Sequence, residues 1–206
     1  MFAIQLNDLG KRYRREWIFR HLSHAFVAPK QYALLGPNGS GKSTLMQLIA
    51  GSLQASEGEI VYRTNNTLVP AEKIYQYIAW AAPAIELIEE FTLEEIIAFQ
   101  TQFKPLRAPF SPQSLIAYIG LEKAKGKLLR EFSSGMKQRV KLALSVCADT
   151  PVLLLDEPTT NLDTTGIALY KKMMHEQTQG RLCIIASNQT HEYEFCDEQI
   201  HVGTLS

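Results

Sequence analysis

Residues 36–44 read Gly-Pro-Asn-Gly-Ser-Gly-Lys-Ser-Thr and contain the complete pattern G-x-x-x-x-G-K-[ST]. The apolar run at residues 32–35 precedes this stretch, and residues 44–50 follow it with apolar side chains at helical spacing. A strand, a glycine-rich loop and a helix in this order bind phosphate groups through backbone N–H groups and the positive end of the helix dipole. The stretch therefore predicts a nucleoside triphosphate site in an α/β fold.

The residue types within this loop have separate tasks. Glycines let backbone N–H groups turn toward the phosphates. The Lys42 ammonium reaches the β and γ phosphates, and the Ser43 hydroxyl is a ligand for Mg²⁺. The residues that we expect to bind nucleotide here are Gly36, Pro37, Asn38, Gly39, Ser40, Gly41, Lys42, Ser43 and Thr44.

Composition and charge indicate an ordinary globular chain. Its 206 residues are 46% hydrophobic and 20% charged, and Lys+Arg and Asp+Glu both number 21. The net charge of zero gives no reason to expect a nucleic acid partner. The densest basic run, residues 11–15, is typical of a solvated hairpin. Three widely spaced cysteines fit neither a disulfide framework nor a zinc site.

The N-terminus and the hydropathy pattern indicate where in the cell the chain is expected. Residues 1–8 carry neither a basic region nor a long apolar stretch, so we expect no signal peptide. No window approaches the run of about 18 apolar residues that a membrane span needs. We expect a cytoplasmic chain, in which any membrane role would come through a partner.

The order of predicted elements changes twice along the chain. Strand-like runs come first, helices follow, and alternating strands and helices return at the end. The predicted strands are residues 2–6, 17–26, 32–35, 59–63, 78–82, 152–155 and 182–186, with one more in the last ten residues. Helices are predicted from Thr92, over 133–148 and over 164–177, and residues 64–70 are predicted to form a turn or loop. The order indicates a mostly parallel core sheet interrupted by a helical insert.

Residues 152–157 read Val-Leu-Leu-Leu-Asp-Glu, an apolar strand that ends in two carboxylates. Ligands bind at the carboxyl ends of strands in open α/β sheets. Asp156 is therefore placed to hold Mg²⁺, and Glu157 to orient or deprotonate an attacking water. Two acidic residues after a strand also cap turns, but the phosphate loop in the same chain favours the metal site.

Residues 131–139 read Glu-Phe-Ser-Ser-Gly-Met-Lys-Gln-Arg. A Ser-Ser-Gly entry into a helix is an ordinary N-terminal cap. The same hydroxyl and free N–H groups also suit a second anion site.

Together these motifs resemble the nucleotide-binding subunit of ATP-binding cassette (ABC) transporters. The loop at 36–44 matches the family fully, residues 156–159 match its magnesium and catalytic-glutamate segment, and residues 160–163 match its D-loop. Residues 132–139 are similar to the family signature Leu-Ser-Gly-Gly-Gln and the Lys-Gln-Arg that often follows it. Other P-loop enzymes lack this signature. The resemblance covers nearly the whole chain, with the motifs in family order.

The resemblance implies a single ATPase domain with a P-loop NTPase core of the RecA type. An N-terminal antiparallel β subdomain and this core would take up about residues 1–84 and 150–206, and a helical subdomain about 85–149. It implies ATP and Mg²⁺ as ligands. It further implies a homodimer, or a pair with another cassette subunit, that acts on transmembrane permease subunits. The chain would then be peripheral at the inner face of the cell membrane, in contact with it only through this partner.

The resemblance also assigns further nucleotide contacts. Tyr13 falls where the family places an aromatic residue that stacks on adenine, and Asp163 lies in the D-loop segment. In a head-to-tail pair, Ser133, Ser134 and Gly135 would contact the γ-phosphate held by the opposite chain. ATP would then join the two chains, and hydrolysis would release them.

The chain departs from the family at several positions. In the signature, Phe132, Ser134 and Met136 replace Leu, Gly and Gln, and we expect these changes to affect packing more than chemistry. Asn188 replaces a histidine, and its amide carries no positive charge; His191 falls three residues later.

The Q-loop glutamine is also replaced. Pro83 stands in its place, and Gln76, upstream, is not favoured as a substitute. We therefore expect slow hydrolysis, with Glu157, Lys42 and Asn188 as the catalytic groups, since one electrostatic group is worth roughly 10²–10³ in rate.

Residues 85–91 follow the altered loop and combine apolar side chains with a rim formed by Glu86, Glu89 and Glu90. They suit two roles equally, a docking surface for a membrane subunit and an ordinary loop packed into the helical part. Two alternatives to a transporter ATPase remain open: an ATP-gated dimerisation module with little hydrolysis, and a soluble cassette that acts elsewhere. The sequence does not indicate the transported substrate, the direction of transport or the membrane partner.

Overall fold

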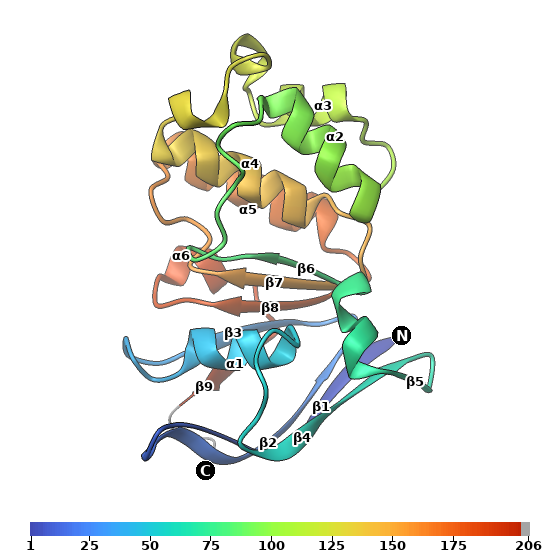
Figure 1. Cartoon of the computed structure of the whole chain (residues 1–206), viewed down its shortest axis with the longest axis vertical. Coiled ribbons are helices and arrows are strands. Elements are labelled where there is room, and N and C mark those ends of the chain that lie inside the picture. Colours follow the sequence, from blue (N-terminus) through green and yellow to red (C-terminus); the bar gives the residue numbers. More distant parts are fainter. Residues whose placement is uncertain (203–206) are drawn as a thin grey trace. The chain divides into compact units, whose positions relative to one another are not determined.

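The computed structural model describes residues 1–202 and divides into two compact units. Among these residues, the first unit contains Met1–Trp80, Pro151–Glu157 and residues 180–202, and the second contains Ala81–Thr150 and Pro158–Gln179. Figure 1 shows the course of the chain. No helix within residues 1–202 is long and apolar enough to cross a membrane.

A five-stranded parallel sheet forms the core of the first unit. Its strands, in spatial order, are β6 (Ile78–Ala81), β7 (Val152–Asp156), β8 (Leu182–Ala186), β3 (Gln31–Leu35) and β9 (Glu198–His201). Every residue of β7 and β8 is buried, which explains their uninterrupted apolar sequences. The helix α1 (Lys42–Ile49) follows β3, and Figure 1 shows it beside the sheet.

An antiparallel sheet completes this unit. Its order is β2 (Glu16–Val27), β1 (Phe2–Tyr13), β4 (Glu57–Thr64) and β5 (Thr67–Val69). The strand β1 alternates buried and half-buried side chains at its start, so one face packs on the core. The predicted loop at 64–70 is partly wrong, because Asn65 and Asn66 adopt positive φ angles of 47° and 67° and close a hairpin that contains β5.

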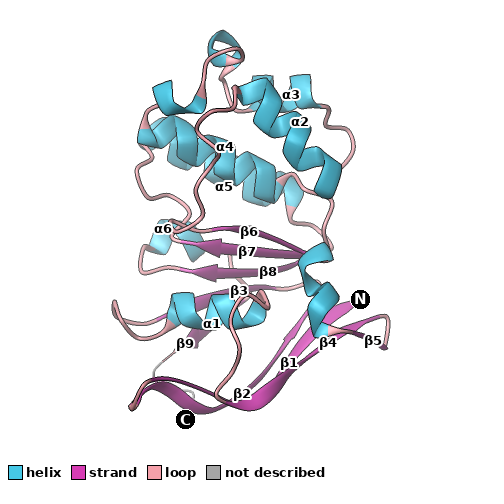
Figure 2. Cartoon of the chain, in the orientation of Figure 1, coloured by secondary structure: helices cyan, strands magenta, loops and turns pink. Residues whose placement is uncertain are grey.

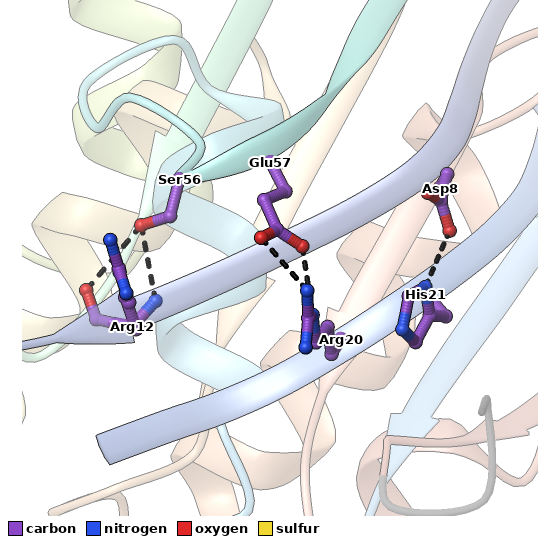
Figure 3. A network of polar contacts seen from close by, with 6 residues as sticks. All are labelled: Asp8, Arg12, Arg20, His21, Ser56 and Glu57. Atoms are coloured by element: carbon purple, nitrogen blue, oxygen red, sulfur yellow. Dashed lines mark hydrogen bonds and ion pairs between the residues drawn. The ribbon is translucent and has the colours of Figure 1, made fainter. Parts of the chain in front are cut away.

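Polar contacts tie the outer part of this sheet together (Figure 3). Arg20 on β2 donates two hydrogen bonds to Glu57 on β4, at 2.8 and 2.9 Å. The Asp8 carboxylate lies 2.9 Å from the His21 ring, and the Ser56 hydroxyl accepts a hydrogen bond from the Arg12 backbone N–H. These contacts fix β2, which bears on the nucleotide site described below.

The second unit is helical (Figure 2). Its α-helices are α2 (Leu93–Phe103), α3 (Pro112–Tyr118), α4 (Ser134–Val146) and α5 (Thr164–Gln177). Thr92 and Glu95 form a capping box at the predicted start of α2, and Pro112 occupies the first turn of α3. The short helices of the chain are η1 (Ala71–Gln76), η2 (Glu122–Ala124), η3 (Leu129–Glu131) and α6 (Thr190–Tyr193).

The predicted fold class is confirmed, with a mostly parallel core sheet, an N-terminal antiparallel sheet and a helical insert. The strand at 182–186 and the helix at 164–177 lie where the sequence predicts them. The strand predicted over 2–6 continues to Tyr13, because bulges let it follow both neighbours. Residues 158–179 belong to the helical unit, whereas the predicted helical subdomain covers only about residues 85–149.

Candidate nucleotide site

The phosphate loop joins β3 to α1 and depends on glycines in unusual conformations. Gly39 and Gly41 have φ angles of 84° and 96°, which residues other than glycine rarely adopt. A Cβ atom on Gly41 would lie 2.5 Å from Cγ2 of Ile18 and 3.0 Å from Cδ1 of Phe19, so β2 closes directly over the loop. The glycine at position 41 is therefore required by conformation and by space.

Lys42 begins α1, and its side chain turns back onto the loop. Its Nζ donates hydrogen bonds to the carbonyl oxygens of Gly36, at 2.7 Å, and Pro37, at 3.3 Å. The residue is only 6% exposed. The ammonium group is therefore held within the loop, at the place where anionic phosphates would compete for it.

Asp156 ends β7 and is buried beside the start of α1. Burial raises the pKa of its carboxyl, and a hydrogen bond from Ser43 opposes that shift. The charge of Glu157 adds to the increase in pKa, while Lys42 lowers it. A carboxylate whose charge is disfavoured by burial would be stabilised by a bound cation.

These donors fit Mg²⁺. Mg²⁺ prefers hard oxygen ligands and is commonly held by one or two protein groups together with substrate phosphates. The Ser43 hydroxyl and the Asp156 carboxylate supply such oxygens in direct contact with each other. Within residues 1–202 no cluster of three or more His, Cys, Asp or Glu side chains could hold a metal by itself.

Glu157 follows the strand with a backbone conformation that is rare for its residue type. Its φ angle is 45°, in the left-handed region. Its backbone N–H donates to the carbonyl of Ala186 on β8, at 2.9 Å. Such conformations cost free energy and cluster at functional sites. The side chain is half-buried and lines the cavity over the phosphate loop.

Asn188 lies against the phosphate loop. Its Nδ2 donates a 3.0 Å hydrogen bond to Oδ1 of Asn38. The preceding Ser187 is buried, and its backbone N–H donates to the carbonyl of Leu34 at the end of β3. The parallel sheet therefore brings the end of β8 beside the start of the loop. His191 lies instead on the short helix α6.

A cavity of about 350 Å³ opens over the loop. Its lining residues are Ile18, Asn38, Gly39, Gly41, Lys42, Ser43, Thr44 and Glu157. Sequence reasoning missed Ile18, which supplies an apolar contact from β2. Its place inside a predicted strand was visible, but its approach to Gly41 depends on the register of β1 and β2, which shifts between Lys11 and Arg12.

Tyr13 is not among the residues that line this cavity. It lies at the end of β1 and is 47% exposed, with the Lys11 ammonium 5.1 Å from its ring centroid. An exposed aromatic ring is available for stacking. Its contact with adenine stays a prediction.

The signature-like segment lies in the helical unit. Ser133 is the N-cap of α4, and its hydroxyl accepts a hydrogen bond from the Met136 N–H at 3.2 Å. Asp163 is the N-cap of α5 and accepts from the Gly166 N–H at 2.8 Å. Ser133 and Ser134 are exposed at the start of α4, and Gly135 is half-buried. Their contact with a nucleotide on another chain stays a prediction.

Neither of the Q-loop candidates offers a polar group for the nucleotide. Pro83 is exposed and has no side-chain donor or acceptor. Gln76 ends η1 and donates to the hydroxyl of its neighbour Tyr75 at 3.2 Å. Gln76 therefore remains an unfavoured substitute for the Q-loop glutamine.

Comparisons with known proteins agree on one family. The family model described as ABC transporter matches residues 19–160. The ABC transporter ATP-binding protein YcbN of Bacillus subtilis is 26% identical over 98% of this chain. The Nod factor export ATP-binding protein I of Rhizobium etli is 30% identical over 96% of it. The chain spans 66% of the first relative and 64% of the second.

A solved structure described as the ATP binding subunit of an ABC transporter shares the fold. It superposes with a TM-score of 0.80 at 24% sequence identity, and the match covers 98% of this chain and 87% of that one.

Proposed function

We propose that this chain, which belongs to the ABC transporter family of ATP-binding proteins, binds Mg·ATP and hydrolyses it to drive a membrane permease. Members of this family are in general ATPases that bind ATP. One observation carries the proposal for this chain: Lys42, the Ser43–Asp156 pair and Glu157 lie together at a glycine loop with an open cavity.

The chemistry follows from these positions. Backbone N–H groups of the loop and the start of α1 bind the phosphates, and Lys42 leaves the Gly36 and Pro37 carbonyls to pair with them. Ser43 and Asp156 would hold Mg²⁺, which when bound neutralises charge on the transferred phosphoryl group. Glu157 would orient and deprotonate the attacking water.

The second chain supplies the rest of the site. We propose a head-to-tail pair in which Ser133, Ser134 and Gly135 of one chain contact the γ-phosphate held by the other. The exposed serine hydroxyls at the positive end of the α4 dipole suit an anion. ATP would bind the closed pair better than the open one, so binding closes the pair and hydrolysis opens it.

Hydrolysis should be slow. The Asn188 amide already lies 3.0 Å from Asn38, so it can reach a γ-phosphate, but it carries no positive charge. Pro83 contributes no polar atom. Each lost electrostatic group is worth roughly 10²–10³ in rate, and the remaining groups would support a reduced turnover.

The deciding experiment measures Mg·ATP turnover across a series of protein concentrations, with Glu157→Gln as the control. We expect turnover that rises more than linearly with concentration and disappears in the variant. Linear turnover would contradict the two-chain site. Turnover equal to that of Glu157→Gln, with ATP still bound, would instead support an ATP-gated module, which the neutral Asn188 favours.

We propose residues 85–91 as the contact with the permease. Residues 85–91 carry both features that the sequence analysis weighed. Ile88 is 41% exposed, whereas Phe91 packs against Phe99 with ring centroids 5.5 Å apart. Glu89 accepts a hydrogen bond from Lys137, so Glu86 and Glu90 are the better candidates for a partner's cations.

A charge test addresses this contact. Reversal of Glu86 and Glu90 to lysine should reduce co-purification with a membrane subunit and leave the basal turnover unchanged. Unchanged co-purification would refute the docking role. This contact would also place the chain at the inner face of the cell membrane, as the sequence analysis expects.

A further inference from the structure

Gln138 is a buried polar residue in the middle of α4 that the proposed chemistry does not use. It is 5% exposed, and its Nε2 donates a 2.7 Å hydrogen bond to the carbonyl oxygen of Pro158. A buried amide that lost this partner would be left unsatisfied, so the contact constrains both ends. The carbonyl that it holds belongs to the residue directly after Glu157.

The chain at Glu157 and Pro158 therefore has two anchors. The Glu157 N–H donates to the Ala186 carbonyl at 2.9 Å, and the Pro158 carbonyl accepts a hydrogen bond from Gln138. Between these anchors the φ angle of Glu157 is 45°. A left-handed glutamate persists only where its surroundings over-determine it. The hydrogen bond from Gln138 holds the carbonyl of the next residue.

Two further contacts tie residues 158–163 to the same helix. A Cβ atom on Gly135 would lie 2.9 Å from the Asn161 carbonyl oxygen, so that the backbone there approaches α4 closely. The Arg139 guanidinium donates to Oδ1 of Asp163 at 2.9 Å and to the Thr165 hydroxyl at 3.0 Å. The first turns of α4 and the segment after Glu157 are thus one connected body.

We infer that Gln138 is a positioning residue for Glu157 and links the state of α4 to the water-activating carboxylate. The inference rests on the proposed function, in which the first turn of α4 meets the nucleotide held by the other chain. If α4 moves when it binds that nucleotide, the hydrogen bond from Gln138 would move the Pro158 carbonyl with it. The occupancy of one ATP site would then set the position of Glu157 in the other site.

The first test replaces Gln138 with Met, which keeps the length of the side chain and removes the donor. Gln113→Met, at an exposed position on α3, is the matched control. We expect Gln138→Met to lower kcat about tenfold with KM unchanged, because one hydrogen bond positions the base and does not bind ATP. The same change in a Glu157→Gln background should have no further effect on residual turnover. A kcat equal to that of wild type, or a rise in KM alone, would overturn the inference.

A second readout does not depend on turnover. Hydrogen exchange of the amides at 159–163 should be at least several-fold faster in Gln138→Met, and exchange at 36–44 should be unchanged. Unchanged exchange at 159–163 would overturn the inference even in a chain without ATPase activity. Absent turnover in the wild type, with faster exchange in the variant, would count against the proposed function alone.

Gln138→Glu covers the case in which the Met variant fails to fold. A protonated carboxyl can donate to the Pro158 carbonyl, whereas a carboxylate cannot. Burial should raise the pKa of this glutamate. The turnover of Gln138→Glu relative to wild type should therefore fall as pH rises through that pKa. A flat ratio would contradict the role of the donated hydrogen bond.

Discussion

Asp156 and Asp163 lie close together in the sequence and have opposite environments. Asp156 ends a buried strand, where burial raises the pKa of its carboxyl despite the hydrogen bond from Ser43. Asp163 caps α5, where the Gly166 N–H, the Thr165 hydroxyl and Arg139 lower the pKa of its carboxyl. Burial disfavours the charge of the first carboxylate, whereas three hydrogen bonds to Oδ1 stabilise the charge of the second.

The difference indicates what each residue does for the molecule. A carboxylate whose charge is disfavoured by its surroundings weakens the fold and gains most from a bound cation. A carboxylate that caps a helix strengthens the fold before any ligand binds. Asp156 should thus matter mainly for activity, and Asp163 should contribute to stability as well as to any nucleotide contact.

The largest effect should come from Asp156→Asn. The amide keeps an acceptor for Ser43 but has no charge to offer Mg²⁺, so turnover should fall by about 10²–10³. Measurement of Mg·ATP turnover and of the Mg²⁺ dependence of nucleotide binding tests this. Asp149→Asn, at an exposed aspartate, is the control. A loss of less than tenfold would mean that Asp156 does not hold the metal.

Asp163→Ala should have its clearest effect on stability. The substitution removes the acceptor for Gly166, Thr165 and Arg139 at the start of α5. A lost N-cap in a chain of this size should lower Tm by about 2–4 °C. Thermal unfolding beside Asp149→Ala measures it. Equal Tm values for the two variants would show that the cap contributes nothing.

The two residues should also respond to pH with opposite signs. Because its folded pKa is raised, Asp156 favours the fold most below its unfolded pKa of about 3.9 and loses that contribution as pH rises through the folded value. Asp163 has a lowered folded pKa, so its contribution is present above about pH 3.9 and is lost as pH falls through the folded value.

A pH series of unfolding checks both signs. At pH near 7, Asp156→Asn should be slightly more stable than wild type, and this advantage should vanish in acid. Asp163→Ala should be less stable than wild type near pH 7 and approach it in acid. If the stability of both variants relative to wild type changed with pH in the same direction, the two carboxylates would not have opposite environments.

Local sequence patterns predicted much of the candidate nucleotide site. The phosphate loop is contiguous, so its strand–loop–helix context can be read directly. Asp156 follows an apolar run, and the parallel sheet places such strand ends at one edge. Asn188, which the family resemblance places at the position of a histidine, lies at the loop, where its Nδ2 donates a hydrogen bond to Asn38. The chemical roles of these residues stay predictions until the experiments above are done.

The contacts that sequence reasoning missed depend on non-local geometry. Ile18 meets Gly41 only because of the shifted register between β1 and β2. Gln138 lies in a predicted helix, and its hydrogen bond to the Pro158 carbonyl joins two segments that no local pattern connects. The grouping of α5 with the helical unit depends on packing between α4 and α5, which no local pattern records.

The smallest effect should come from a third acidic residue, Glu57, which lies outside the candidate site and is partly exposed, unlike Asp156. Its carboxylate accepts two hydrogen bonds from Arg20, whose guanidinium also lies 4.5 Å from the Trp17 ring centroid. Both side chains of the pair remain substantially exposed, at 46% for Arg20 and 39% for Glu57. Exposed ion pairs add little, so Glu57→Gln should lower Tm by less than about 1 °C, and salt should reduce even that. Thermal unfolding at low and high ionic strength measures it. A drop as large as that of Asp163→Ala would mean that the ordering of β2, and with it Ile18 over the phosphate loop, depends on this pair.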